Sequence, residues 1–172
     1  VWSARHLVGS EPVAVLLADD LILGASCVKE MVDAYKAGNM VAVMDVPHEQ
    51  TGSYGIVTPG SDDGRIVQVE GLVEKPDPSS APSNIAVVGR YIITPEVFET
   101  LAAQERGAGG EIQLTDALAK QIGKAPFSGV RFSGERYDCG SKLGFLQANV
   151  AFGLNNNAMR DQLRDWLGER LG

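Results

Sequence analysis

The stretch Val13-Ala14-Val15-Leu16-Leu17-Ala18-Asp19-Asp20 runs through six apolar or small residues without alternation and stops at two carboxylates. A continuous apolar run of this length is typical of a strand buried on both faces, as in a parallel sheet covered by helices. In open α/β sheets, ligands bind just outside the carboxyl ends of such strands. Two acids there could hold a divalent cation beside a phosphate, because Mg²⁺ takes one or two carboxylates plus substrate oxygens. A solvated acidic strand end is the simpler alternative.

The next segments continue this pattern. Residues 26–37 place Val28, Met31, Val32 and Tyr35 on one helical face, and residues 40–46 form a second apolar run. Together with the first strand they predict a βαβ unit. Residues 54–57 and 65–73 flank a strong turn signal at 61–64, which indicates an antiparallel excursion from the parallel sheet.

The remaining segments complete the predicted fold. A strand at 84–93, helices after Thr94 and at 114–122, a strand at 126–132 and a helix capped by Ser141 follow in order. The sequence therefore predicts an α/β fold with a mixed, mainly parallel Rossmann-like sheet flanked by helices, an antiparallel excursion and C-terminal helices.

We expect two parts, residues 1–154 and a C-terminal amphipathic helix at 155–172. That helix carries one apolar stripe, which we expect to pack on the chain's own core, with self-association as the alternative. The stripe comprises Met159, Leu163, Trp166, Leu167 and Leu171. The chain starts without Met in what reads as a helix already under way, so we expect a piece of a longer protein whose fold is incomplete without an upstream segment.

Composition narrows the classes of partner. The chain has 172 residues and a net charge of −7, from 15 basic against 22 acidic residues, and no Lys/Arg cluster. This charge balance argues against a nucleic-acid or anionic-membrane surface as the main partner. No apolar run approaches the roughly 20 residues of a membrane helix. The two cysteines, Cys27 and Cys139, lie far apart, which favours a reduced, cytoplasmic setting.

Seven short segments, in this order and spacing, resemble the bacterial UTP–glucose-1-phosphate uridylyltransferases, within the wider sugar-phosphate nucleotidyltransferases. They are Leu16-Leu17-Ala18-Asp19-Asp20-Leu21, Tyr54-Gly55-Ile56-Val57, Val73-Glu74-Lys75-Pro76, Ala81-Pro82-Ser83-Asn84, Gly89-Arg90-Tyr91-Ile92, Gly109-Gly110-Glu111-Ile112-Gln113-Leu114-Thr115-Asp116-Ala117 and Tyr137-Asp138-Cys139-Gly140-Ser141-Lys142. The resemblance extends from about Val1 to Leu154 and implies a fold of the nucleotide-diphospho-sugar transferase type, with a sugar-binding antiparallel excursion.

The resemblance also implies roles for individual residues. Asp19 and Asp138 would both be ligands of one Mg²⁺, and Asp20 would be a neighbour rather than a ligand. Glu74 would accept hydrogen bonds from sugar hydroxyls, and Lys75 would meet the sugar phosphate as a point charge. Without the resemblance, Glu74-Lys75-Pro76 is most simply a charged turn before a loop.

Three further positions would shape the sugar pocket. Gly55 would let the backbone approach the sugar, and Tyr54 would wall the pocket. Gly89 would likewise let the backbone approach the sugar, because a glycine inside a strand otherwise weakens that strand. An ordinary strand start explains Tyr54 and Gly55 equally well.

The reaction implied by the resemblance is attack of a glucose-1-phosphate oxygen on the α-phosphorus of UTP, giving UDP-glucose and pyrophosphate. Asp19 and Lys75 would be the catalytic groups, since such a transfer needs alignment and charge neutralisation more than a nucleophilic side chain. The family's glycine-rich triphosphate loop does not precede Asp19 here. We therefore expect the isolated chain to be inactive although its parent is active.

Two other interpretations stay open. One is a different sugar-1-phosphate nucleotidyltransferase, for instance a thymidylyl enzyme, because base choice lies mostly in the absent part. The other is a non-catalytic sugar-phosphate-binding or oligomerisation module, which would use Glu74 and Lys75 without a metal pair. The resemblance further implies a homo-oligomer, either a dimer or a tetramer.

Overall fold

The computed structural model describes residues 1–103 and 113–172 and divides them into two compact units. Unit 1 comprises Val1–Leu16 and Cys27–Phe132, and unit 2 comprises Leu17–Ser26 and Ser133–Gly172. Each unit is built from segments that are distant in the sequence. Asp19 and Asp138 therefore belong to one unit, and Glu74 and Lys75 belong to the other.

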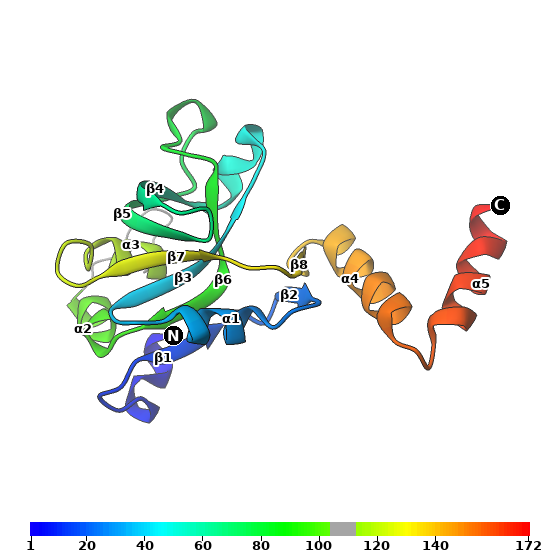
Figure 1. Ribbon diagram of the computed structural model, residues 1–172, viewed down its shortest axis with the longest axis horizontal. Helices are drawn as coiled ribbons and strands as arrows, with labels where there is room; N and C mark the ends of the chain where they lie inside the picture. The colour runs from blue at the N-terminus through cyan, green and yellow to red at the C-terminus, as the bar shows by residue number, and fades with distance from the viewer. Residues whose placement is uncertain (104–112) are drawn as a thin grey trace. The chain divides into compact units, whose positions relative to one another are not determined.

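Unit 1 is built on a six-stranded sheet with the order β1-β6-β3-β7-β5-β4 (Figure 1). The strands are β1 (Val13–Leu16), β3 (Asn39–Asp45), β4 (Gly55–Asp62), β5 (Ile66–Glu74), β6 (Ile85–Ile93) and β7 (Phe127–Arg131). A further pairing of Ile56 in β4 with Ala86 in β6 joins the last strand of this order to the second one. The sheet is mixed and partly closed on itself.

The prediction of a mainly parallel sheet is wrong. Within the described residues, β3 and β7 form the one parallel pair, and every other strand pair is antiparallel. β6 lies between β1 and β3 and is antiparallel to both, so β1 and β3 run in the same direction without touching as neighbours. All nine residues of β6 are buried, and a fully buried apolar strand carries no sequence signal for its direction.

β1 also departs from the prediction that it is buried on both faces. Its residues alternate between half-buried and exposed, and Leu16 is 53% exposed. Among the described strands, β1 pairs with β6 alone. The apolar run therefore forms a strand at one edge of this sheet, with one face packed on the core and the other open.

Helices cover the core of unit 1. They are η1 (Trp2–Leu7), α1 (Cys27–Ala34), η2 (His48–Ser53), η3 (Pro78–Ser80), α2 (Pro95–Ala103) and α3 (Leu114–Ala119). The core joins Val41, Val57 and Val67 of the sheet to Val97 of α2 and Leu118 of α3, all fully buried. In α1, Met31 of the predicted face is buried, whereas Val32 is 58% exposed.

A glycine with a left-handed backbone lies between α1 and β3. Gly38 adopts a φ of +74°, and a Cβ there would lie 1.9 Å from the carbonyl oxygen of Pro126. Only glycine fits both the left-handed backbone and this close approach. The carbonyl oxygen of Gly38 also accepts a hydrogen bond from the Tyr35 hydroxyl at 2.9 Å.

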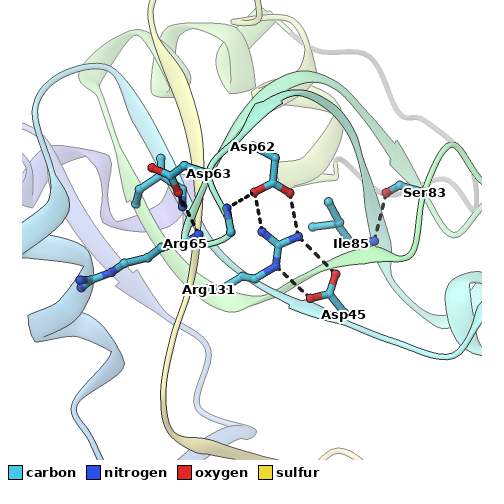
Figure 2. Close-up of polar contacts among 9 residues, drawn as sticks. Asp45, Asp62, Asp63, Arg65, Ser83, Ile85 and Arg131 are labelled. Atoms are coloured by element: carbon cyan, nitrogen blue, oxygen red, sulfur yellow. Dashed lines mark hydrogen bonds and ion pairs between the residues drawn. The ribbon is translucent and has the colours of Figure 1, made fainter.

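An ion triad ties three strands of unit 1 together (Figure 2). Arg131, at the end of β7, donates from Nε to Asp45 Oδ2 at 2.9 Å and from Nη1 to Asp62 Oδ1 at 2.9 Å. Asp45 ends β3, and Asp62 ends β4. The guanidinium therefore bridges two carboxylates with the planar geometry that favours arginine over lysine.

Unit 2 contains a two-stranded antiparallel ribbon, β2 (Asp20–Leu23) with β8 (Glu135–Asp138), and the helices α4 (Lys142–Asn155) and α5 (Arg160–Leu171) (Figure 1). Ser141 caps α4 as predicted, because its Oγ accepts a hydrogen bond from the Gly144 N–H at 2.9 Å. β2 was not among the strands predicted from the sequence.

Helix α4 buries small residues and leaves large apolar side chains exposed. The buried residues of α4 are Gly144, Ala148 and Gly153, whereas Leu143 and Leu146 are 66% and 61% exposed. No residue of α5 is buried, so the prediction that its apolar stripe packs on the core is wrong. α5 contacts α4, where the side chain of Leu163 lies against Gly153. Among the described residues, no helix is both long and apolar enough to cross a membrane.

Candidate functional site

The β2–β8 ribbon brings Asp19 and Asp138 together. Asp20 pairs with Asp138 in the register, and the Cys139 N–H donates to the Asp19 carbonyl oxygen at 2.7 Å, which extends the ribbon by one residue. Asp19 is exposed and Asp138 is half-buried. The two carboxylates meet at one end of an antiparallel ribbon, not at the ends of two parallel strands.

Gly140 keeps the space between these carboxylates open. Its N–H donates to Asp138 Oδ1 at 2.9 Å. A Cβ at this position would lie 3.0 Å from Asp138 Oδ1 and 3.3 Å from Asp19 Oδ2, so both carboxylates border the same small volume. A methyl group would fill that volume, and glycine leaves it free.

This arrangement fits Mg²⁺. Two hard oxygen ligands from the protein leave the other positions of an octahedral ion for phosphate and water oxygens. Within residues 1–103 and 113–172 there is no group of three or more His, Cys, Asp or Glu side chains of the kind that would form an all-protein cage. Asp19 and Asp138 are the residues that could hold the ion.

Asp20 has a different environment from Asp19, although the two are adjacent. Its side chain is 7% exposed and forms an ion pair with Arg136 Nε, whose side chain is 12% exposed. An ion pair this deeply buried is costly to break, because removal of one partner leaves the other charged and unsolvated. The carboxylate of Asp20 thus holds the two strands of the ribbon together.

In unit 1, the β4–β5 hairpin places Tyr54, Gly55, Glu74 and Lys75 side by side. Gly55 pairs with Glu74 in the register, and the Lys75 N–H donates to the Tyr54 carbonyl oxygen at 2.9 Å. Glu74 is half-buried, and Lys75 is exposed. Among the described residues, neither side chain has a hydrogen bond or an ion pair, so both charges are available to a ligand.

Lys75 has an unusual backbone. Its φ is +46°, and no other non-glycine residue in the described ranges has a positive φ. It also precedes Pro76, which favours an extended conformation at the preceding residue. Such a conformation costs roughly 1–3 kcal/mol and is found most often at functional sites.

Thr115 lies beside this group and was missed by the sequence analysis. A Cβ on Gly55 would lie 3.2 Å from Glu74 Oε2, 3.4 Å from Thr115 Cγ2 and 3.6 Å from Thr115 Oγ1. Thr115 sits in the first turn of α3, which packs on β5. Its motif was recognised, but a helix residue 60 positions from Gly55 offers no periodicity that would place it there.

Gly89 lies in β6, where the register against β3 is irregular. Val43 pairs with Val87 and Val41 pairs with Tyr91, so β6 contains extra residues between these pairs. A glycine inside a strand often marks such a bulge. The Gly89 carbonyl oxygen accepts a hydrogen bond from Arg90 Nη1 at 3.0 Å.

A cavity and a buried cysteine lie apart from the predicted site residues. A cavity of about 410 Å³ is lined by Ser61, Asp62, Asp63, Ile66, Gln68, Pro126, Phe127 and Ser128, none of them a predicted site residue. Burial raises the pKa of the Cys27 thiol to about 11, so this cysteine is protonated and unreactive near neutral pH. Of the motif at 109–117, Gly109-Gly110-Glu111-Ile112 lies outside the described residues.

Comparison with known proteins places this geometry in a family. Residues 1–153 match the family described as "Nucleotidyl transferase". The UTP–glucose-1-phosphate uridylyltransferase of Komagataeibacter xylinus is 49% identical over 170 residues, which are 97% of this chain and 57% of that protein. The enzyme of the same name from Bacillus subtilis (strain 168) is 44% identical over 166 residues, 95% of this chain and 57% of that protein.

Solved structures of proteins with these names are also similar to this chain. A UDP-glucose pyrophosphorylase complexed with UDP-glucose is 38% identical, with a TM-score of 0.85 over 90% of this chain and 61% of that one. A UTP-bound enzyme from Acinetobacter baumannii is 30% identical, with a TM-score of 0.82 over 98% of this chain and 60% of that one. The 172 residues thus span about 60% of the length of these relatives. The chain belongs to the nucleotidyl transferase family, as a homologue of the UTP–glucose-1-phosphate uridylyltransferases.

Proposed function

We propose that the chain is the sugar-phosphate-binding and metal-binding part of an enzyme that transfers a uridylyl group from UTP to glucose-1-phosphate. The products are UDP-glucose and pyrophosphate. The observation that carries the proposal is the 44–49% identity to uridylyltransferases over nearly the whole chain. Glu74 and Lys75, whose charges are unpaired within residues 1–103 and 113–172, would provide the chemistry that such a substrate needs.

The hairpin would bind and orient the sugar phosphate. Glu74, a half-buried acceptor, would take hydrogen bonds from sugar hydroxyls, and Gly55 would leave room for the ring. Lys75 would contact the phosphate as a compact charge and hold its attacking oxygen towards the α-phosphorus of UTP. Tyr54 would form one wall, and Gly89 would allow close backbone approach from β6.

Asp19 and Asp138 would hold Mg²⁺ through their carboxylates. When bound, the ion supplies positive charge that neutralises the phosphate oxygens during the transfer. The Asp20–Arg136 pair and the Gly140 N–H would fix the orientation of the two carboxylates. No side chain needs to form a covalent intermediate.

The same proposal includes the ligands, the oligomeric state and the location of the whole enzyme. UTP and UDP-glucose would be ligands of the whole enzyme, in a cytoplasmic homo-oligomer that is a dimer or a tetramer. Residues 1–154 would bind the ligands, and residues 155–172 would form a C-terminal helix. The exposed apolar side chains of α4, Leu143, Phe145, Leu146 and Phe152, supply a surface for self-association.

Calorimetric titration of the 172-residue chain with glucose-1-phosphate tests the sugar site. We expect Lys75→Ala and Glu74→Gln each to weaken binding about tenfold or more, because each removes a charged hydrogen-bond partner. Lys36→Ala, at another exposed lysine, is the matched control and should bind like wild type. Equal binding by all four proteins would contradict the placement of the sugar site.

An assay of UDP-glucose formation from UTP, glucose-1-phosphate and Mg²⁺ tests the reaction. We expect no product from the 172 residues alone and product from a longer chain that includes the upstream segment of the relatives. In that longer chain, Asp19→Ala should abolish turnover. Unchanged turnover in Asp19→Ala, with sugar-phosphate binding lost in Lys75→Ala, would favour a binding module over an enzyme. Product from dTTP in place of UTP would favour a thymidylyl enzyme.

A further inference from the structure

We propose that the turn of the β4–β5 hairpin and the start of β7 form a binding site for a small organic ammonium ion with an apolar body. The site is the cavity of about 410 Å³ in unit 1, a volume within the range of about 300–1,000 Å³ that is usual for small-molecule sites. Gly55 and Glu74 lie at the opposite end of the same hairpin. The inference therefore stands independently of the proposed sugar site.

The residues that line the cavity combine apolar surface with negative charge. Ile66, Pro126 and Phe127 contribute apolar side chains. Among the described residues of the lining, the charged ones are Asp62 and Asp63, and none is a Lys, Arg or His. The apolar side chains favour a ligand with a carbon body, and the two carboxylates disfavour a phosphate or another anion.

The two aspartates differ in what their oxygens already bind. Both oxygens of Asp62 accept hydrogen bonds from Arg131, at 2.9 Å from Nη1 and 3.0 Å from Nη2. Asp63 Oδ1 accepts from the N–H groups of Arg65 and Ile66 at 2.9 Å and 2.7 Å. Asp63 Oδ2 makes no hydrogen bond with residues 1–103 or 113–172. Asp63 Oδ2 is therefore the acceptor that an ammonium group would use.

The charge of Asp63 is not neutralised by its surroundings. The N–H groups of Ile66 and Arg65 hold the pKa of Asp63 below its usual 3.8, so its carboxyl group is ionised near neutral pH. Arg131 shares its single positive charge between Asp45 and Asp62. Figure 2 shows the Arg65 guanidinium pointing away from Asp62 and Arg131. A ligand cation would supply the charge that is missing here.

The shape of the cavity is held by contacts within the protein. The Asp63 N–H donates to the Ile66 carbonyl oxygen at 3.2 Å, and Ser61 Oγ donates to Gln68 Oε1 at 3.1 Å. Phe127 is 6% exposed and belongs to the hydrophobic core of unit 1. A ligand would thus enter a site whose side chains are already in place, which lowers the entropy lost on binding.

A series of probes with one ring and different charges tests the site. Benzylammonium, benzyl alcohol and benzoate are each titrated into the isotope-labelled 172-residue chain and followed by amide NMR spectra. We expect benzylammonium to shift the signals of residues 61–68 and 126–128. Its affinity should exceed that of benzyl alcohol about three- to fivefold, the effect of one ion pair at an exposed carboxylate. Benzoate should not bind, and glucose-1-phosphate should not displace benzylammonium.

Two variants separate the contribution of charge from that of shape. Asp63→Asn keeps an oxygen for the N–H groups of Arg65 and Ile66 and removes the charge. Its affinity for benzylammonium should fall about three- to fivefold, to the value for benzyl alcohol, whose own affinity should not change. Ser128→Leu places a larger side chain in the cavity and should weaken both probes. Glu99→Gln, at an exposed carboxylate on α2, is the matched control and should bind like wild type.

Each contrary outcome overturns the inference. Benzylammonium that binds nowhere, or that shifts signals only outside residues 61–68 and 126–128, excludes this site. Equal affinities for benzylammonium and benzyl alcohol, or for wild type and Asp63→Asn, exclude the role of the carboxylate. Displacement of benzylammonium by glucose-1-phosphate would show that the two ligands share one site. None of these results alters the proposed function, which is tested by the binding of glucose-1-phosphate.

Discussion

At the scale of single residues, Lys75 is the position where backbone conformation and proposed ligand binding coincide. Its left-handed backbone, with φ of +46°, is held by the hydrogen bond from its N–H to Tyr54 and is followed by Pro76. The same residue carries the charge assigned to the sugar phosphate. Replacement of Lys75 by glycine should therefore raise the free energy of unfolding and lower the affinity for the sugar phosphate.

Lys75→Gly tests this opposition. Glycine adopts a positive φ without the steric cost of a Cβ, so we expect the free energy of unfolding to rise by about 0.5–1 kcal/mol. Glucose-1-phosphate affinity should fall as it does in Lys75→Ala, which keeps the Cβ and gains no stability. Urea unfolding and calorimetry on the three proteins measure both effects. A Lys75→Gly variant less stable than Lys75→Ala would show that the backbone carries no strain.

Gly140 is a second residue whose missing side chain matters. Gly140→Ala would place a Cβ 3.0 Å from Asp138 Oδ1 and 3.3 Å from Asp19 Oδ2, so the carboxylates would have to move apart. We expect Mn²⁺ affinity, measured by the electron paramagnetic resonance of the free ion, to fall about tenfold. Gly168→Ala is the control in the same unit, because a Cβ there meets nothing within 4 Å. Equal Mn²⁺ binding by the two variants would exclude a metal between these carboxylates.

At the scale of elements, the Arg131 triad makes the free energy of unfolding depend on pH. The Arg131 guanidinium, with help from the Gly64 N–H, holds the pKa of Asp62 below its usual 3.8. A carboxyl whose pKa is lower in the folded state stabilises the fold above its unfolded pKa, and the effect is lost as pH falls through the folded pKa. The contribution should thus be complete above about pH 4 and disappear below it.

Arg131→Met measures that contribution. We expect it to destabilise the chain at pH 7, with a difference from wild type that shrinks steadily below about pH 4, in urea unfolding curves between pH 7 and pH 2. Lys29→Met removes an exposed ion pair with Asp33 on α1 and should have little effect at any pH. A stability difference for Arg131→Met that is constant with pH would show that packing, and not charge, explains its effect.

The buried Asp20–Arg136 pair should couple β2 to β8. Removal of either partner alone leaves an unpaired buried charge, so Asp20→Asn or Arg136→Met should each cost about 3–5 kcal/mol. The double variant should be more stable than the sum of the single effects predicts, because no uncompensated charge remains. Additive single effects in a double-mutant cycle would indicate that the two residues act independently.

Sequence patterns were sufficient for elements whose signals are local. The strands at 40–46 and 126–132 were found within a residue of β3 and β7, and Ser141 was recognised as the cap of α4. The same patterns could not reveal β2, whose four residues form a strand only because β8 pairs with them. They also could not order the sheet, since β6 inserts between two strands that lie earlier in the chain.

The residues of the candidate site also fall into two groups, those that local motifs identify and those that depend on contacts between distant segments. The motifs identified Asp19, Asp138, Glu74 and Lys75, and the structure brings each pair together within its own unit. Their functional assignment stays a prediction. Thr115 and the buried pair of Asp20 with Arg136 depend on contacts between distant segments, which carry no local signal.

At the scale of the whole molecule, the chain spans about 60% of the length of its relatives and still contains both groups of proposed ligand residues. Binding and turnover should therefore be separable. The 172 residues should bind glucose-1-phosphate and a divalent cation, whereas UDP-glucose formation should need the longer chain. This separation makes the shorter chain useful for measuring sugar-phosphate affinity without turnover.

The β2–β8 ribbon has a consequence for the folding pathway. Its ion pair joins residues 116 positions apart, so the entropy of closing a long loop is lost before the ribbon gains any contact. The ribbon should form after the folding transition state, and a cation held by Asp19 and Asp138 should then slow unfolding without accelerating folding. In stopped-flow chevron plots, Mg²⁺ should lower the unfolding rates and leave the folding rates unchanged. The metal would then increase the lifetime of the native chain without changing how fast it folds.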